Sequence, residues 1–166
     1  LMIRMIDVAY LSKIKQLFHM ILSEAPCSLN VSALSEHIDM SRATTMNYIK
    51  YLKDARLLNL LYYEDKQWPS KPNRVYVQNT NIAYSVGERN LSPQLIAETF
   101  FYNALHGNHK INATERTALF LVDGKYYFDV SEKPPYRQVI RTTAVGNVEQ
   151  STQPMQVPLW LFGFLY

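Results

Sequence analysis

The first quarter of the chain carries apolar residues at the spacing of buried helical faces. Between residues 11 and 25 they recur at i, i+3, i+4, i+7 and i+8, which is typical of one buried stripe on a helix that ends near Ala25-Pro26. The stripe consists of Ile14, Leu17, Phe18, Ile21 and Leu22. A second, short helix is predicted after it, with Asn30 or Ser32 as N-cap and the apolar anchors Val31, Leu34 and Ile38.

A third helix is predicted from a cap at Ser41 to about Leu58. Helical geometry divides its residues between two sides. The expected buried side comprises Ala43, Met46, Ile49, Leu52 and Leu57. The expected outward side comprises Thr44, Asn47, Tyr48 and Tyr51. Three helices joined in this way, with a three-residue turn before the last one, predict a helix-turn-helix.

Two strands are expected to follow the third helix, at 57–63 and 74–77. The segment between them contains Pro69 and Pro72, which break regular structure. It also contains Lys66 and Lys71, which leave positive charge at a loop tip. The pair of strands is therefore interpreted as the wing of a winged helix-turn-helix.

The second half of the chain reads as a helix followed by strands. Apolar residues from 95 to 105 predict the helix, and 118–122 and 125–130 are expected to form a hairpin around Asp123-Gly124, a dipeptide that favours tight turns. The apolar residues 157–166 predict a final buried strand. Residues 142–156 are polar and show little periodicity, and Asn79-Thr80-Asn81 reads as a turn that ends a strand.

Composition narrows the setting of the protein. The single cysteine, Cys27, cannot form an internal disulfide, which indicates a reducing, cytoplasmic location. The longest apolar run is far shorter than the roughly 20 residues that span a bilayer, so no membrane partner is expected. The first residues lack the pattern of a signal peptide. A glycine-rich phosphate-binding loop is absent, so this chain is not expected to hydrolyse ATP by itself.

Net charge is only +3, so affinity for nucleic acid would have to come from local clustering. Residues 42–56 form such a cluster, because Arg42, Lys50, Lys53 and Arg56 outnumber Asp54 there. The predicted DNA-binding residues of helix and wing are Ser41, Arg42, Thr44, Thr45, Asn47, Tyr48, Tyr51, Lys66, Lys71 and Arg74. A three-helix packing module with a solvated polar face is the alternative, and the sequence gives the two about equal weight.

Four segments together resemble the C-terminal region of a family of bacterial AAA-type ATPases: Arg74–Asn81, Glu98–Phe101, Val122–Val130 and Val157–Tyr166. In that family a P-loop ATPase domain precedes a winged helix and a small domain similar to restriction-endonuclease cores. The resemblance runs from about Tyr10 to Tyr166. It implies ATP and Mg²⁺ as cofactors of an ATPase domain upstream, and none in this segment.

The resemblance also implies a nuclease-type metal site, and this sequence departs from it. Relatives commonly place an aspartate directly before Phe120, where this chain has Leu119. Asp129 matches the second acidic position, Lys133 lies four residues after it rather than two, and Glu98 matches a helix glutamate. These three candidate catalytic residues would hold Mg²⁺ poorly, because it needs well-placed carboxylates. The site is therefore interpreted as degenerate, with no metal bound.

The sequence thus predicts an α+β chain of two units: a winged helix-turn-helix in residues 1–80 and, in residues 81–166, a small α/β domain resembling a reduced restriction-endonuclease core. The expected function is that of a non-catalytic accessory region of an ATPase. Its expected partners are duplex DNA, the upstream ATPase domain of the same protein, or a second copy of itself. A protein-interaction or regulatory module without DNA binding is the second hypothesis, and a metal-dependent nuclease is the third.

Overall fold

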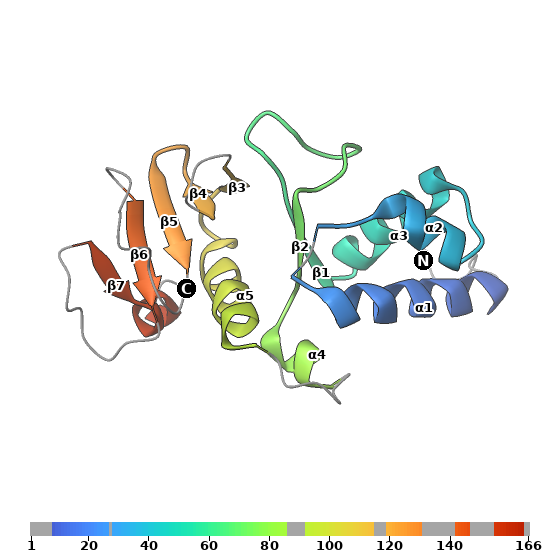
Figure 1. The fold of residues 1–166 in the computed structure, drawn as a ribbon, viewed down its shortest axis with the longest axis horizontal. Helices are drawn as coiled ribbons and strands as arrows, with labels where there is room; N and C mark the ends of the chain where they lie inside the picture. The colour runs from blue at the N-terminus through green and yellow to red at the C-terminus, as the bar shows by residue number, and fades with distance from the viewer. Residues whose placement is uncertain are drawn as a thin grey trace.

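A computed structural model describes residues 8–26, 28–85, 92–114, 119–130, 142–146 and 155–164 of this chain. These residues form a mixed α+β structure that contains six helices and two sheets within the described ranges (Figure 1). A helical head lies at one end and a five-stranded sheet at the other, with a two-stranded sheet between them. The α+β class expected from the sequence is confirmed.

The helical head consists of α1 (Val8–Glu24), α2 (Val31–His37) and α3 (Arg42–Asp54). Two of its helices begin where the sequence predicted a cap. The Asn30 side chain accepts a hydrogen bond from the Ala33 amide at 3.2 Å, and Ser41 Oγ accepts one from the Thr44 amide at 3.1 Å. Each cap satisfies an amide that the first turn of a helix leaves free.

Helix α3 is shorter than predicted, because it ends at Asp54 rather than near Leu58. Arg56 takes a left-handed conformation with φ of 56°, which stops the helix. The chain then enters β1 (Leu58–Leu61) directly. The chain therefore changes direction within a few residues, although this part of the sequence contains no glycine or proline that would predict the end of the helix.

The hairpin of β1 and β2 (Arg74–Val77) is buried on both faces. The strands are antiparallel, with Leu58 opposite Val77. Leu60 and Val75 pack into the core of the helical head, whereas Leu61 and Tyr76 pack into the core of the second unit. Alternation of side chains along the strands thus supplies both cores from one hairpin. The two predicted units therefore share the β1–β2 hairpin, which contributes side chains to both of their cores.

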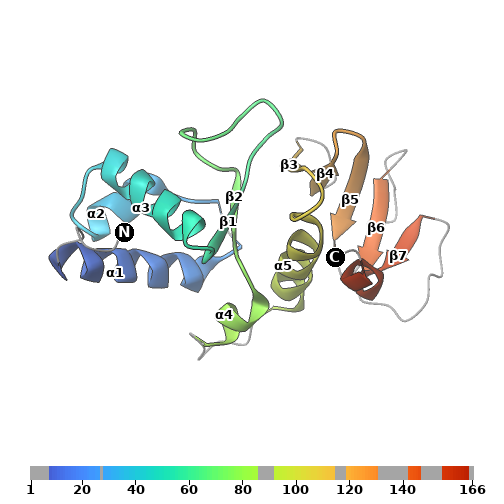
Figure 2. The ribbon, with the colours of Figure 1, turned by 180° about the vertical axis from the view of Figure 1, so that it is seen from behind.

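After β2 the chain turns through α4 (Thr80–Ser85) and leads to α5 (Pro93–Leu105). The predicted turn at Asn79 is present, because the Asn79 side chain accepts a hydrogen bond from the Asn81 amide at 2.8 Å. The short helix α4 that this turn starts was not predicted. Helix α5 agrees with the predicted helix and packs against β5 on one face of the larger sheet (Figure 2).

The larger sheet contains β3 (Ile111–Ala113), β4 (Phe120–Val122), β5 (Tyr126–Val130), β6 (Thr142–Gly146) and β7 (Gln156–Pro158), in that spatial order. The first three strands are antiparallel, and β5, β6 and β7 are parallel. The turn between β4 and β5 has φ of 53° at Asp123 and 65° at Gly124, as the predicted tight hairpin requires. Strand β6 was not predicted, since its sequence shows no clear alternation.

The C-terminal segment corrects the sequence prediction of one long final strand. Strand β7 ends at Pro158, and a 3-10 helix, η2 (Leu159–Phe164), follows it. Proline lacks the amide that would continue the strand pairing. The helix buries Phe162 against Phe101 and Phe128 and leaves Phe164 exposed. The run of apolar residues therefore contributes the buried Phe162 and the partly buried Val157 and Leu159 to the core, rather than one long strand.

Candidate functional site

The first turn of α3 uses three of the predicted DNA-binding side chains, Ser41, Thr44 and Thr45, for its own structure. Ser41 Oγ caps the helix and also lies 2.8 Å from Thr44 Oγ1. The Thr45 hydroxyl donates a hydrogen bond to the Ser41 carbonyl at 3.0 Å, and Thr45 is fully buried. Its predicted role as an outward contact is therefore wrong, because a hydroxyl satisfied within the helix can face the core.

Tyr48 is a second correction on the same helix. It was predicted to face outward, but it is only 7% exposed and packs into the core of the head. Its ring centroid lies 6.2 Å from that of Tyr51, which is exposed. Ala43, expected on the buried side, is exposed instead. The buried stripe of α3 is formed by Thr45, Tyr48, Ile49 and Leu52.

The opposite half of α3 is open to solvent. Arg42, Asn47 and Lys53 are exposed, and Lys50 retains 40% exposure of its side chain. Lys50 Nζ forms a salt bridge of 2.6 Å with Asp54, one turn further along the helix. Within the described ranges, neither Arg42 nor Lys53 forms a salt bridge. The outer face of α3, meaning these four residues, therefore presents positive charge that the described residues only partly compensate.

The loop between β1 and β2 rises beside this helix, between the head and the larger sheet, in both ribbon views (Figures 1 and 2). Lys66 and Lys71 are exposed on it, as predicted. Arg74, the third predicted contact of the wing, is not available in the same way. Its guanidinium Nη1 lies 2.7 Å from Glu98 Oε2, and its side chain is only 35% exposed. The structure thus uses Arg74 inside the protein.

A pocket of about 310 Å³ lies between α3 and this loop, and it is called the α3–loop pocket below. Its lining comes from three places in the sequence: Lys50 and Lys53 from α3, Leu60 and Tyr62 from β1 and the residue after it, and Gln67 and Trp68 from the loop. Trp68 and Gln67 were not predicted as site residues. The sequence feature that could have identified them is a tryptophan within an otherwise polar, proline-containing loop.

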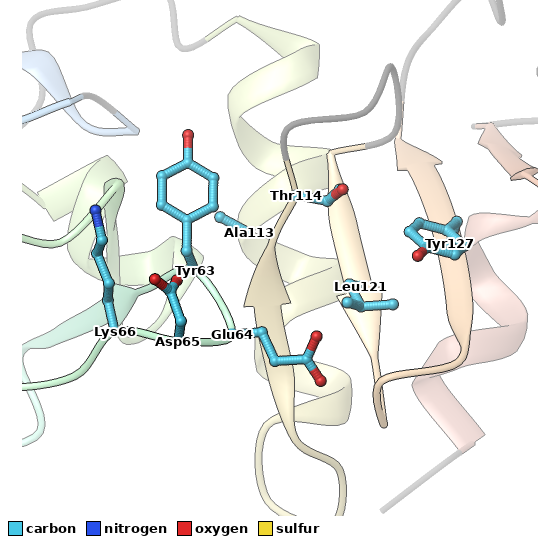
Figure 3. A pocket seen from close by; sticks show the side chains of 8 residues that line it. All are labelled: Tyr63, Glu64, Asp65, Lys66, Ala113, Thr114, Leu121 and Tyr127. Carbon is cyan, nitrogen blue, oxygen red and sulfur yellow. The ribbon is translucent and has the colours of Figure 1, made fainter.

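A second pocket, of about 380 Å³, lies on the opposite side of the loop, between it and strands β3 to β5 (Figure 3). Glu64 and Asp65 give it an acidic lining, and Glu64 extends toward Leu121 in this view. Lys66 Nζ lies 5.9 Å from the centroid of the Tyr63 ring. One loop therefore borders a basic, aromatic pocket on the α3 side and an acidic pocket on the side of the sheet.

Glu98 is buried on α5, where its two carboxylate oxygens accept hydrogen bonds from three side chains. Oε2 accepts from Arg74 at 2.7 Å and from the Tyr76 hydroxyl at 3.2 Å. Oε1 accepts from Gln94 Nε2 at 2.8 Å, and Gln94 also donates to the Val130 carbonyl. This group of four side chains, the Glu98 cluster, joins the β1–β2 hairpin to the second unit.

Electrostatics within the Glu98 cluster favour the ion pair. Burial lowers the pKa of Arg74, but the nearby Glu98 and Tyr76 outweigh that effect and raise it above its ordinary value. Burial and, second, the Glu98 charge raise the pKa of Tyr76 far above its ordinary value, so its hydroxyl remains a donor. The predicted metal ligand Glu98 is therefore surrounded by donors that belong to the protein.

Asp129, the second predicted catalytic residue, lies on β5. Burial and, to a smaller extent, the negative charge of Glu98 raise its pKa above the ordinary value. Glu98 is thus close enough to act on Asp129 electrostatically, although no hydrogen bond joins the two. Leu119, at the position where the resemblance predicts a first acidic residue, packs partly buried against the core of the second unit. Lys133 lies outside the described residues.

The turn between β4 and β5 uses its own acidic residue. Asp123 Oδ2 lies 2.7 Å from His109 Nδ1, and Asp123 Oδ1 accepts a hydrogen bond from the Lys110 amide at 2.9 Å. The hydrogen bond with His109 and then that with Lys110 lower the pKa of Asp123. These contacts agree with the prediction that Asp123 is a turn residue.

In the described part of the chain, no three His, Cys, Asp or Glu side chains are grouped so that they could hold a metal ion. None of its helices combines the length and the apolar character that crossing a membrane would need. Comparison with known proteins found no matching family model, no matching curated protein and no matching solved structure.

Proposed function

We propose that this chain is a non-catalytic accessory module that binds nucleic acid through its helical head and the adjacent loop. In this proposal the head and the β1–β2 hairpin act as a winged helix. Helix α3 is the recognition helix, and the loop between β1 and β2 is the wing. Arg42, Asn47, Lys50 and Lys53 contact the nucleic acid from the helix, with Lys66 and Lys71 reaching its backbone from the loop.

The observation that carries the proposal is the open outer face of α3. A helix that only packs two units together could also have a solvated polar face, but on this face Arg42 and Lys53 are exposed cations that no described carboxylate neutralises. Cations that form no salt bridge with a described residue keep their charge available for phosphate groups. Asn47 is a residue type that reads adenine edges in the major groove. Charge and hydrogen-bonding capacity thus coincide on one side of one helix.

The role of the second unit in this proposal is to support the wing and to connect it to the rest of a larger protein. The resemblance to the C-terminal region of AAA-type ATPases suggests an ATPase domain as that neighbour, in a cytoplasmic protein that uses ATP and Mg²⁺ there. A helix, three antiparallel strands and two parallel strands are also what a reduced restriction-endonuclease core would contain. The Glu98 cluster would then hold the wing against the second unit rather than bind metal.

A protein-interaction or regulatory module is the second candidate, and a specific observation favours it. Exposed large apolar side chains include Tyr10, Leu11 and Tyr51 on the head and Trp160, Leu161 and Phe164 on η2. Exposed aromatic residues are enriched at protein interfaces. The metal-dependent nuclease ranks third, because three side chains of the protein already donate hydrogen bonds to the oxygens of the Glu98 carboxylate.

A salt titration with duplex DNA tests the proposal. Fluorescence anisotropy of a labelled duplex would be measured against the wild-type chain at increasing salt concentration. We expect binding that weakens linearly on a log–log plot, with a slope of roughly −0.9 for each phosphate that is neutralised. No binding at low salt would overturn the proposal and would favour the protein-interaction module. Cleavage of the duplex in Mg²⁺, abolished by Asp129→Ala, would instead favour the nuclease.

A further inference from the structure

The α3–loop pocket offers more than a charged surface. Its two lysines lie on the side formed by α3. Tyr62, Trp68 and Leu60 line the other sides with aromatic and apolar surface. Its volume of about 310 Å³ lies at the lower end of the range for small-ligand pockets. Trp68 is half-buried, so one part of its ring remains accessible.

The chemistry of this lining selects a ligand that is planar and anionic at once. A purely apolar ligand would remove the Lys53 ammonium group from water without compensation, whereas Lys50 is already paired with Asp54. A free inorganic anion would satisfy the lysines but leave the aromatic wall unfilled. A nucleobase joined to its phosphate meets both requirements, because the base can stack on an aromatic side chain while the lysines approach the backbone.

We propose that the α3–loop pocket is a subsite for one unpaired nucleotide of a nucleic-acid strand, with the base against Trp68 and the adjoining phosphates near Lys50 and Lys53. This inference rests on the proposed nucleic-acid binding and adds a preference to it. Bases in an intact duplex are stacked on their neighbours and cannot enter a pocket unless they are flipped out. The pocket therefore favours single-stranded segments, frayed ends or flipped bases over uninterrupted duplex.

Tryptophan fluorescence can report on the pocket directly. The chain contains two tryptophans, so Trp68 is the only tryptophan in the Trp160→Phe variant, and its fluorescence can be followed alone under excitation that is selective for tryptophan. This variant would be titrated with an oligothymidine of about 12 nucleotides, and separately with a blunt duplex of equal length. We expect the single strand to quench Trp68 in a saturable way. The duplex should bind with the salt dependence described above but leave the Trp68 emission nearly unchanged.

Substitution separates stacking from charge. Trp68→Leu should weaken single-strand binding about ten-fold, a typical loss on removing one stacking aromatic, and should leave duplex affinity unchanged. Lys53→Gln should weaken binding of both forms. Tyr126→Leu is the matched control, because Tyr126 is an exposed aromatic with Lys125 Nζ only 4.9 Å from its ring centroid but lies outside this pocket. It should change neither affinity.

The outcomes distinguish this inference from the function on which it rests. If the duplex binds and the single strand causes no Trp68 quenching, the nucleotide subsite is refuted and the DNA-binding proposal stands. If neither nucleic acid binds at low salt, both fail. Circular dichroism of Trp68→Leu checks that the variant is folded. Should it be unfolded, the Trp68 quenching in the Trp160→Phe chain still decides the question.

Discussion

Around Glu98, three side chains of the protein donate hydrogen bonds to the carboxylate, whereas on the outer face of α3 neither Arg42 nor Lys53 forms a salt bridge with a carboxylate of the described residues. The two regions contain the same kinds of charged group. They differ in burial, since the Glu98 side chain is 6% exposed and the cations of α3 face solvent. Burial forces a charged group to find partners within the protein.

The contrast explains how one hairpin can serve two purposes. Arg74 and Tyr76 on β2 are held by Glu98, which fixes the hairpin against the second unit. The loop at the other end of the same hairpin carries Lys66 and Lys71, which are exposed. A fixed base and a loop with two exposed lysines are what the proposed wing needs to approach a phosphate backbone. In the proposal, the Glu98 cluster stabilises the hairpin, and the pocket and the loop bind the nucleic acid.

The largest effect is expected on removing Glu98. Glu98→Ala leaves a half-buried guanidinium and a buried tyrosine hydroxyl without their acceptor, so it should lower the free energy of unfolding by about 3 kcal/mol. Urea denaturation measures this loss. Glu36→Ala, on an exposed position of α2, is the control and should change stability by less than about 0.5 kcal/mol. Equal effects of the two substitutions would show that the Glu98 cluster does not join the units.

The next effect is expected on charge reversal at α3. The double variant Lys50→Glu, Lys53→Glu should bind duplex DNA at least about ten-fold more weakly at low salt, with little change in stability, because surface salt bridges contribute little. Anisotropy titration measures the affinity. The control is Lys110→Glu, Lys125→Glu, which changes net charge equally at exposed positions of the second unit. An equal loss in both double variants would mean that only net charge matters.

A smaller effect is expected at Asp129. Its pKa is raised in the folded chain, so its contribution to stability is present below the unfolded pKa of ~3.9 and is lost as pH rises through the folded pKa. Asp129→Asn should therefore stabilise the protein at pH 7, by less than about 1 kcal/mol because the side chain is partly exposed. Urea denaturation at several pH values should show this gain shrinking as pH falls. A loss of stability at pH 7 would contradict the assignment.

Local chemistry made part of this arrangement predictable. The cap Ser41 and the turn at Asp123-Gly124 follow from side chains that bond to nearby backbone or permit unusual dihedral angles, so the sequence identified them, and it limited the cap of α2 to Asn30 or Ser32. Contacts between distant segments were not predictable in the same way. Arg74 and Glu98 are 24 residues apart, and Arg74 was therefore assigned to DNA when the fold assigns it to Glu98.

The burial of α3 was mispredicted for a related reason. Tyr48 looked polar by residue type, yet its ring belongs to the core, and Thr45 is buried because the Ser41 carbonyl satisfies its hydroxyl. Trp68 and Lys50 line the same pocket only because the loop folds back beside α3, and no local sequence pattern encodes this fold. Parallel pairing of β5 with β6 likewise depends on a long connection. Sequence patterns predicted the helices of the head, the two hairpins and α5, and tertiary contacts decided which charges remained free.

The most direct test compares two single cations, one from each region. The slope of log affinity for duplex DNA against log salt concentration would be measured for Lys53→Gln and Arg74→Gln, at a temperature where both variants are folded. The slope should become shallower by about 1 for Lys53→Gln, because one phosphate contact is lost, and should stay at the wild-type value for Arg74→Gln. A shallower slope for Arg74→Gln with no change for Lys53→Gln would contradict the division of roles between the two regions.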